Sequence, residues 1–229
     1  MTTDPLRWAR YAELASSPGL VRTAYNAWMS HIPTLSQLLA FRPPPARLLS
    51  IGCSVGMVDI LFAGHGYQVT SIDTDETALQ IAADNARKVG VQLDLRLGDA
   101  FDLSDYHGRY DVAFSAGLVE HWQGERTVEL VREHARCAPI VQVEVPTKHT
   151  RHIAGVPEVL ADMRLYTRRQ FVDRVREADL KVDRVYATGS VPTFTRRAIE
   201  AALPPILFRR LQLAFGYSMG VGVVARRRS

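Results

Sequence analysis

Cysteine and lysine are scarce in this sequence of 229 residues. Its two cysteines, Cys53 and Cys137, are too few for a disulfide framework, and they lack the spacing of metal ligands. Only three of the 28 basic residues are lysine, and many of the arginines stand in scattered pairs among acidic residues. Although the formal net charge is +4, basic residues spread in this way do not favour nucleic-acid binding. The exception is the run Arg226–Arg228, which we interpret as a solvated chain end.

Long apolar runs are absent as well. No stretch approaches the roughly 20 apolar residues that span a bilayer, and residues 1–17 lack the basic and then apolar order of a signal peptide. We therefore expect a cytoplasmic protein with no membrane partner. The length, together with 47% hydrophobic residues, predicts a single domain over residues 1–229. The sequence predicts no particular oligomeric state.

The apolar pattern changes where the sequence reads RPPPAR. Before this point, apolar and aromatic residues recur at helical spacing and predict two or three short helices, broken at Pro18 and Pro33. After it, strand-like apolar runs alternate with amphipathic segments, of which residues 75–90 are the clearest. This alternation predicts an α/β fold with a parallel sheet that is covered by helices on both faces. The expected parts are an N-terminal helical cap (1–44) and a ligand-binding core (45–229) with an insertion (147–166).

The stretch LLSIGCSVGMVDIL, residues 48–61, passes from a buried strand through a loop of small residues into a helix. Such a loop usually presents backbone N–H groups to a ligand. A nicotinamide enzyme would have Gly-x-Gly-x-x-Gly here, whereas Ser54 stands in the middle and no third glycine follows Gly56. A Walker loop is excluded because no Lys-Ser or Lys-Thr follows the glycines.

Acidic residues end the next two expected strands. Asp73 lies at the carboxyl tip of VTSID, where a carboxylate can accept hydrogen bonds from both hydroxyls of a ribose. Asp99 follows the third strand in LGDAFDL, and the segment YDVAFSAGLVEHW comes next. With the glycine loop, and with RLYTRRQFVDRVREADLKVDRVYATG further on, this order resembles the class I S-adenosylmethionine-dependent methyltransferases. The resemblance covers about residues 45–226; each motif alone is weak, and the four in this order are specific.

The resemblance implies a Rossmann-like, doubly wound sheet of seven strands in the order 3-2-1-4-5-7-6. Residues 186–191 would end the sixth strand, and residues 216–227 would return as an antiparallel seventh strand between the fifth and the sixth. Ligands of such a sheet bind beyond the carboxyl ends of the strands, where the strand order reverses.

The resemblance also implies S-adenosylmethionine as the cofactor. The glycine loop would let the backbone approach the methionine end of the cofactor, Asp73 would bind the ribose diol, and Asp99 with Ala100 would bind the adenine. The segment after the fourth strand would pass beneath the sulfonium. For each aspartate, a helix N-cap is the alternative role. The residues expected to bind the cofactor are Ser50, Gly52, Ser54, Gly56, Asp73, Thr74, Asp99, Ala100 and Ser115.

Position 50 departs from the pattern of the family. An acidic residue usually ends the first strand there and helps to hold the ammonium group of the cofactor, whereas this sequence has Ser50. A backbone carbonyl or a side chain such as Ser54 would take over part of that contact. A non-catalytic cofactor-binding domain that pairs with an active partner is the alternative that this departure leaves open.

Methyl transfer from a sulfonium requires an aligned nucleophile and exclusion of water, and it requires a base only if the acceptor carries a proton. His121, in GLVEHW just past the fourth strand, is the first candidate for that base. His31 and His149 are the next candidates, and a structural role is the alternative for each of them. Some relatives hold a metal at this Glu-His pair, but they carry another Glu shortly before it, so we expect no metal here.

The acceptor pocket is expected between the N-terminal helices, the insertion and the segment 195–215. Tyr11, Tyr25, Trp28, Met29 and His31 would form an aromatic lid or, alternatively, ordinary core. The motifs of DNA amino-methyltransferases and cytosine-carbon methyltransferases are absent. The sequence therefore predicts methyl transfer to an oxygen, nitrogen or carbon atom of a small molecule, such as a specialised metabolite. An RNA or protein methyltransferase is the alternative activity.

Overall fold

The structure, a computed structural model, describes residues 20–152, 163–189, 202–216 and 218–228. Its seven-stranded sheet has the order β3-β2-β1-β4-β5-β7-β6. Strand β7 pairs antiparallel with both β5 and β6, and the other pairings are parallel. The predicted fold class, strand order and direction of the seventh strand are thereby confirmed. The strands are β1 (Arg47–Ile51), β2 (Gln68–Asp73), β3 (Asp94–Leu97), β4 (Val112–Ala116), β5 (Ile140–Pro146), β6 (Leu180–Thr188) and β7 (Gly220–Arg227).

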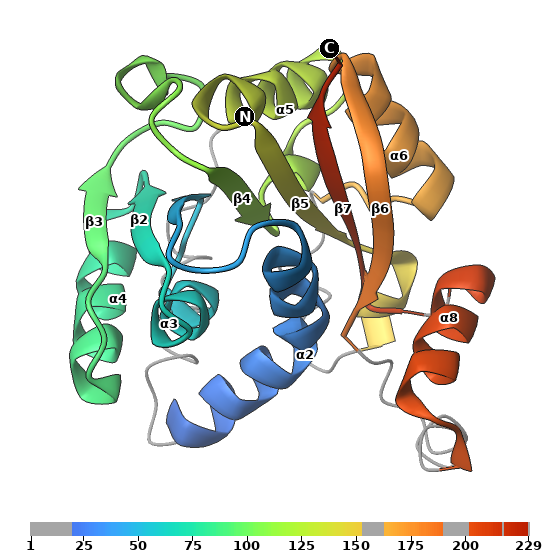
Figure 1. Cartoon of the computed structure of the whole chain (residues 1–229), viewed down its shortest axis with the longest axis horizontal. Helices are drawn as coiled ribbons and strands as arrows, with labels where there is room; N and C mark the ends of the chain where they lie inside the picture. Colours follow the sequence, from blue (N-terminus) through green and yellow to red (C-terminus); the bar gives the residue numbers. More distant parts are fainter. Residues whose placement is uncertain (1–19, 153–162, 190–201, 217, 229) are drawn as a thin grey trace.

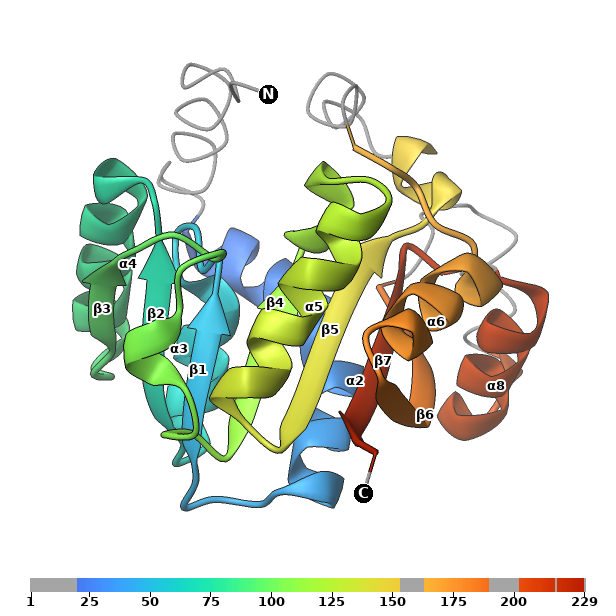
Figure 2. The same cartoon turned by 90° about the horizontal axis from the view of Figure 1, so that it is seen from above.

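Helices cover both faces of this sheet. Helices α2, α3 and α4 lie on one face, α5 and α6 lie on the other, and α8 lies beside β6 at the end of the sheet (Figures 1 and 2). The helices are α2 (Leu20–Phe41), α3 (Met57–Gly64), α4 (Glu76–Val89), α5 (Glu125–Cys137), α6 (Arg168–Glu177) and α8 (Pro205–Phe215), with short 3-10 helices η1 (Ser104–Tyr106), η2 (Val119–His121) and η3 (Lys148–His152). In the described part of the chain, no helix has the length and apolarity that a membrane span requires.

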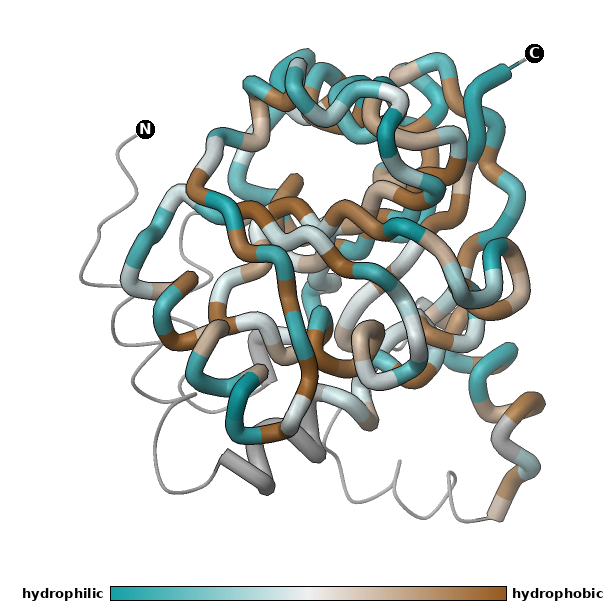
Figure 3. The backbone as a smooth tube through the Cα atoms, turned by 60° about the vertical axis from the view of Figure 1, so that its left-hand side comes forward, coloured by the Kyte–Doolittle hydropathy of each residue, from teal (hydrophilic) through white to brown (hydrophobic). Residues whose placement is uncertain are grey.

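The apolar core forms two layers, one on each face of the sheet. Leu130, Val143 and Phe171 are fully buried in the layer under α5 and α6, whereas Leu48 and Phe62 are fully buried under α2 and α3. Because the central strands are covered on both faces, they consist largely of apolar residues. The tube coloured by hydropathy shows these hydrophobic stretches running through the middle of the molecule (Figure 3).

Helix α4 begins and ends where its sequence signals predict. The Asp75 carboxylate accepts hydrogen bonds from the backbone N–H groups of Thr77 and Ala78, which is the N-cap arrangement. At the other end, Gly90 adopts a left-handed conformation (φ 78°) that a glycine takes without strain. The segment 75–90 was therefore interpreted correctly.

The predicted helix break at Pro33 is wrong. Helix α2 continues through Pro33 over 22 residues. A proline inside a helix removes one hydrogen bond and costs roughly 3 kcal/mol, but the next two turns bury Leu35 and Leu38 against the sheet. This burial offsets the local cost, so that tertiary packing overrides the proline. The other expected break, at Pro18, lies outside the described residues, and the division into a cap and a core stays a prediction.

The carboxyl ends of β1, β2 and β4 meet at one edge of the sheet. In the register of β1 and β2, Ile51 pairs with Ile72, so the loop that leaves β1 starts beside Asp73. On the other side of β1, Ser50 pairs with Phe114 of β4. Because the strand order reverses between β1 and β4, this is the edge at which a ligand is expected to bind.

We expect Gly222→Ala to destabilise the fold. Gly222 pairs with Tyr186 across β6 and β7, and a Cβ atom at position 222 would overlap the buried tyrosine ring. The free energy of unfolding should fall by about 1–3 kcal/mol in urea denaturation, the usual cost of overpacking a core. Gly64→Ala is the matched control because its Cβ would meet nothing within 4 Å. Equal stabilities of the two variants would contradict this account of Gly222.

Candidate functional site

The glycine loop between β1 and α3 has an unusual backbone. Gly52, Ser54 and Gly56 all have positive φ angles, of 73°, 50° and 74°. The N–H groups of Gly52 and Cys53 both donate to the Ile72 carbonyl, at 2.8 and 3.1 Å, and this fixes the loop to β2. A Cβ at position 52 would lie 2.8 Å from a methyl carbon of Leu118. The conformation and the close packing therefore both require glycine at position 52.

Asp73 joins the loop to the start of α4. Its Oδ2 atom accepts a hydrogen bond from the Ser54 N–H at 2.7 Å, and its Oδ1 atom accepts one from the Asp75 N–H at 3.0 Å. Burial raises the pKa of this carboxyl, and the two backbone hydrogen bonds partly offset the rise. Each carboxylate oxygen has a second lone pair that can accept from a ligand hydroxyl. Binding of a ribose by Asp73, next to the exposed Thr74, stays a prediction.

The end of β3 reaches the same edge. The Gly98 N–H donates to the Asp73 carbonyl at 3.0 Å, so Asp99 and Ala100 follow immediately beside it. Asp99 is exposed, and its Oδ1 atom accepts from the Phe101 N–H at 2.9 Å in a local turn. The structure therefore brings these two expected adenine-binding residues to the edge where Asp73 lies.

Ser115 has a different environment from the one expected. It is fully buried, and its hydroxyl lies 2.9 Å from His134 Nε2 on α5. The other ring nitrogen, Nδ1, donates to the Leu130 carbonyl at 2.7 Å, so Nε2 accepts from the serine. Burial lowers the pKa of His134 to about 4, which keeps the ring neutral. The Ser115 hydroxyl is thus engaged with α5, and only the backbone of this residue is left for a cofactor contact.

Asp59 on α3 is a candidate site residue that the sequence analysis did not identify. It is 1% exposed and lies over the sheet face where Ser50 and Ser71 pair across β1 and β2. Burial raises its pKa to about 6, and the two serine hydroxyls partly offset that rise. Neither carboxylate oxygen has a hydrogen bond of ordinary geometry within the described residues. A carboxylate therefore does stand next to Ser50, where the family has an acidic residue on the strand itself.

A partly buried tryptophan and a buried asparagine support the loop from outside. The Trp28 indole N–H donates to the Met57 carbonyl at 2.8 Å, and the buried Asn85 amide donates to the Val55 carbonyl at 3.1 Å. Trp28 thus packs α2 against the start of α3 instead of forming an exposed lid. Of the other expected lid residues, Met29 is half exposed, Tyr11 lies outside the described residues, and the Tyr25 side chain is not described.

The candidate histidines come from three elements. His121 lies in η2 after β4, His149 lies in η3 after β5, and His31 lies on α2. His31 Nδ1 is 3.0 Å from Oε2 of Glu144, a buried residue of β5 that the sequence analysis did not single out. Beside His121, burial raises the pKa of Glu120 to about 8, so this acid is largely protonated at neutral pH.

The two cysteine thiols are difficult to ionise. Burial raises the pKa of the Cys53 thiol far above its ordinary value, and it raises that of Cys137 to about 12. Both thiols are therefore poor nucleophiles. Within the described ranges, no three His, Cys, Asp or Glu side chains are grouped so that they would hold a metal ion.

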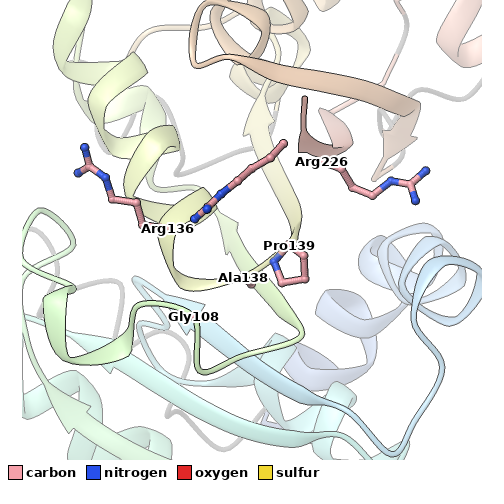
Figure 4. A pocket seen from close by; sticks show the side chains of 6 residues that line it. Gly108, Arg136, Ala138, Pro139 and Arg226 are labelled. Carbon is pink, nitrogen blue, oxygen red and sulfur yellow. The ribbon is translucent and has the colours of Figure 1, made fainter. Parts of the chain in front are cut away.

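A cavity of about 330 Å³ lies at the opposite edge of the sheet (Figure 4). Its lining includes Pro139 before β5 and the end of the antiparallel β7, so it opens at the amino ends of β4 and β5. The arginines in its lining are engaged: Arg226 pairs with Asp183 at 2.5 Å, Arg227 donates to the Ala135 carbonyl at 2.7 Å, and Arg136 pairs with Glu133. This cavity is separate from the glycine loop and is not the expected cofactor site.

The sheet order, the left-handed glycine loop and the acid at the tip of β2 are together typical of Rossmann-like domains that bind nucleoside-containing ligands. Residues 48–138, which are 91 of the 229 residues, match the family described as a methyltransferase domain. This part of the chain is therefore similar to the methyltransferase-domain family, which agrees with its resemblance to the class I S-adenosylmethionine-dependent methyltransferases.

Known proteins agree with this assignment. The ubiquinone biosynthesis O-methyltransferase of Azorhizobium caulinodans is 33% identical over 75 residues, which are 33% of this chain and 30% of that protein. The ribosomal RNA small subunit methyltransferase C of Alcanivorax borkumensis is 27% identical over 95 residues, 42% of this chain and 28% of that protein. The chain thus spans less than a third of these curated relatives.

A solved structure extends the likeness to nearly the whole fold. The magnesium protoporphyrin IX methyltransferase of Synechocystis PCC 6803, crystallised with bound SAH (S-adenosylhomocysteine), has a TM-score of 0.65 to this chain. The alignment covers 97% of this chain and 93% of that one at 16% identity, which shows the shared fold. The matched family is that of a methyltransferase domain, as the sequence analysis expects, and this neighbour shares the fold.

The raised pKa of Asp59 predicts a pH-dependent stability. Because the pKa is about 6 in the fold and 3.8 ordinarily, the folded state binds the proton more tightly. Asp59 therefore destabilises the fold increasingly as the pH rises from about 4 through 6. The asparagine of the Asp59→Asn variant cannot ionise. At pH 7.5 the free energy of unfolding of this variant should therefore exceed that of the wild type by up to about 3 kcal/mol, at roughly 1.4 kcal/mol per pKa unit.

Urea denaturation of both proteins between pH 4 and 7.5 measures this difference. Glu120 and other groups also titrate, but they are common to both proteins and cancel in the comparison. A stability difference that does not change with pH would show that the Asp59 carboxyl is not perturbed.

Proposed function

We propose that this protein transfers the methyl group of S-adenosylmethionine to an oxygen, nitrogen or carbon atom of a small molecule. The observation that carries the proposal is the carboxylate of Asp73 at the tip of β2, joined by a hydrogen bond to the glycine loop through Ser54. S-adenosylmethionine, when bound, supplies a methyl group on a positively charged sulfur, which is an excellent leaving group. The protein then has to bind it, orient the acceptor and exclude water.

The residues at the carboxyl edge fit this ligand. Asp73 offers two carboxylate oxygens to a ribose diol, and its partial burial strengthens such charge-assisted hydrogen bonds. Asp99 and the backbone of Ala100 lie one strand away, where an adenine would extend from the ribose. On the other side, Gly52 packs against Leu118 and leaves no room for a side chain. The loop is thus held compactly beside the edge where we propose that the ligand binds.

Asp59 can supply the negative charge that is missing at position 50, where the family usually has an acidic residue. A buried carboxylate without a cation is unfavourable, as its raised pKa indicates. The ammonium group of the cofactor would supply the missing positive charge and lower that pKa again. We therefore propose that Asp59 holds the ammonium group in place of the acid that Ser50 replaces.

The small-molecule acceptor is favoured over RNA by the placement of the basic groups. The arginines near the end of β7 lie at the edge opposite to Asp73, and Asp183 and a backbone carbonyl already engage two of them. One relative is named for a quinone pathway and another for ribosomal RNA, so the relatives alone do not separate the acceptors. Methylation of RNA or protein remains the alternative, and a cytoplasmic location stays a prediction from the sequence.

Calorimetry with S-adenosylhomocysteine tests the cofactor site. Asp73→Ala removes a charged acceptor from a partly buried site, so it should cost about 2–4 kcal/mol of binding free energy, a loss of roughly 30-fold to 1000-fold in affinity. Asp99→Ala should lose less, because Asp99 is exposed and the Ala100 backbone N–H remains. Asp59→Asn should also weaken binding at pH 7.5.

The matched control is Asp84→Ala, which removes an exposed acid of α4 that pairs only with Arg87 in the described contacts. Because Asp73 also fixes the loop, circular dichroism must show that its variant is folded. Wild-type affinity in a folded Asp73→Ala protein would contradict the proposed site.

A further inference from the structure

Glu144 is a buried acid on the face of the sheet that α2 covers. Its side chain is 4% exposed. On β5 it pairs with Ala116, the last residue of β4, and its backbone carbonyl accepts a hydrogen bond from the Gly117 N–H at 3.2 Å. Glu144 therefore lies at the carboxyl edge, beside the segment expected to pass beneath the sulfonium. A charge buried here requires specific hydrogen-bond partners.

Two side chains donate hydrogen bonds to Glu144, and a third side chain lies close to it. The Tyr186 hydroxyl donates to Glu144 Oε1 at 2.8 Å, and the Thr34 hydroxyl donates to the same oxygen. His31 Nδ1 lies 3.0 Å from the other oxygen, Oε2. The amide of Gln142 donates to the Tyr186 hydroxyl at 2.7 Å and to the Thr34 carbonyl at 2.9 Å, which fixes both donors. Oε1 is thus occupied, whereas Oε2 has no hydrogen bond of ordinary geometry within the described residues and lies next to His31.

We propose that His31 is the general base of the methyl transfer, that Glu144 is its positioning residue, and that the acceptor therefore carries an O–H or N–H group. A buried carboxylate next to one ring nitrogen keeps the proton on that nitrogen. The other nitrogen, Nε2, then has a lone pair that can take a proton, as in other His-carboxylate pairs. This inference rests on the proposed methyltransferase activity and narrows its acceptor to a class such as phenols.

The proton transfer is balanced. The lone pair of the acceptor oxygen or nitrogen forms the new bond to the methyl carbon, while the carbon–sulfur bond breaks and its electron pair stays on sulfur. The acceptor proton passes to His31 Nε2, and the Glu144 carboxylate stabilises the resulting imidazolium. The His31 side chain is 21% exposed, so the proton can afterwards leave to solvent.

Titratable groups face His31 from three elements. Glu144 approaches from β5. Asp59 on α3 also lies close, since a positive charge on His31 lowers the pKa of Asp59. Tyr186 on β6 has a pKa well above its ordinary value, through burial first and the charge of Glu144 second, so it remains a neutral donor. We expect turnover to fall at acidic pH, because a protonated imidazole has no lone pair to accept the proton.

The first experiment uses the full chain with bound S-adenosylhomocysteine and no acceptor. Nitrogen-15 NMR of labelled histidine reports which ring nitrogen carries the proton in the neutral ring. We expect the proton of His31 on Nδ1 in the wild type, and a mixture of both tautomers in Glu144→Gln. Calorimetry on the same samples should give affinities for S-adenosylhomocysteine within about threefold of each other, so that loss of the cofactor site would be recognised separately.

The second experiment measures turnover with methyl-labelled S-adenosylmethionine. The acceptors are catechol, 3,4-dihydroxybenzoate and tyramine, which carry protons, and iodide, which carries none. His31→Gln should reduce methylation of a protonated acceptor by roughly 10²–10⁴, whereas any methylation of iodide should be unchanged. Glu144→Gln should reduce methylation of a protonated acceptor by a smaller factor. It should also alter the pH profile of turnover, which a loss of folded protein would not do.

His107→Gln is the matched control. His107 Nε2 lies 3.0 Å from Glu133 Oε2, the same separation as in the His31 pair, but it stands before β4 at the opposite edge of the sheet. This variant should keep the wild-type turnover and pH profile. His121→Gln tests the first candidate of the sequence analysis in the same assay.

The outcomes distinguish a failure of the proposed methyltransferase function from a failure of the proposed role of His31. A wild-type protein that does not bind S-adenosylhomocysteine contradicts the proposed function itself. With binding intact, three results overturn the role of His31: a neutral ring protonated on Nε2, a tautomer unaffected by Glu144→Gln, or a His31→Gln protein that keeps more than about a third of the turnover. If none of the acceptors is methylated, the NMR measurement of the His31 tautomer, in the wild type and in Glu144→Gln, alone decides whether the proposed role of His31 holds.

Discussion

The carboxylate of Asp73 is the contact on which the geometry of the carboxyl edge depends. Its side chain accepts from the backbone of the glycine loop and from the start of α4, and its backbone carbonyl accepts from Gly98 at the end of β3. A charged acceptor holds N–H donors more strongly than a neutral one. The loop contains three residues with positive φ and needs such a fixed anchor, because its conformation is otherwise costly for Ser54.

Much of the fold is predictable because its signals are local. Strands covered on both faces appear as short apolar runs, and α4 has a capping aspartate and a terminal glycine. The order of the strands and the direction of β7 came from the family resemblance, since an apolar pattern alone does not specify which strands pair. Pro33 shows the limit of a local rule, because only the docking of Leu35 and Leu38 explains a helix that continues through it.

The candidate site likewise contains residues that local sequence signals identify and residues that they do not. Asp73 and the glycine loop are recognisable because the sequence itself places them after strands. Asp59 and Glu144 were missed because their environments depend on distant residues: Thr34 and Glu144 are 110 positions apart. Within IVQVEVP, the alternation of Gln142 and Glu144 with valines resembles a strand with one solvated face. Only when α2 covers that face do these polar residues become buried.

The two faces of the central strands therefore have different chemistry. Toward α5, the side chains Val141, Val143 and Val145 are buried and apolar. Toward α2 and α3, the same depth holds Ser50, Ser71, Gln142 and Glu144, with Asp59 above them. Burying ionisable groups lowers stability, so a fold that needed only a stable core would have apolar residues there. Buried acids gathered at one edge, with a raised pKa at Asp59, are instead typical of a functional site. In our proposal, this cost is offset at that edge by the binding of a positively charged cofactor and by the transfer of a proton.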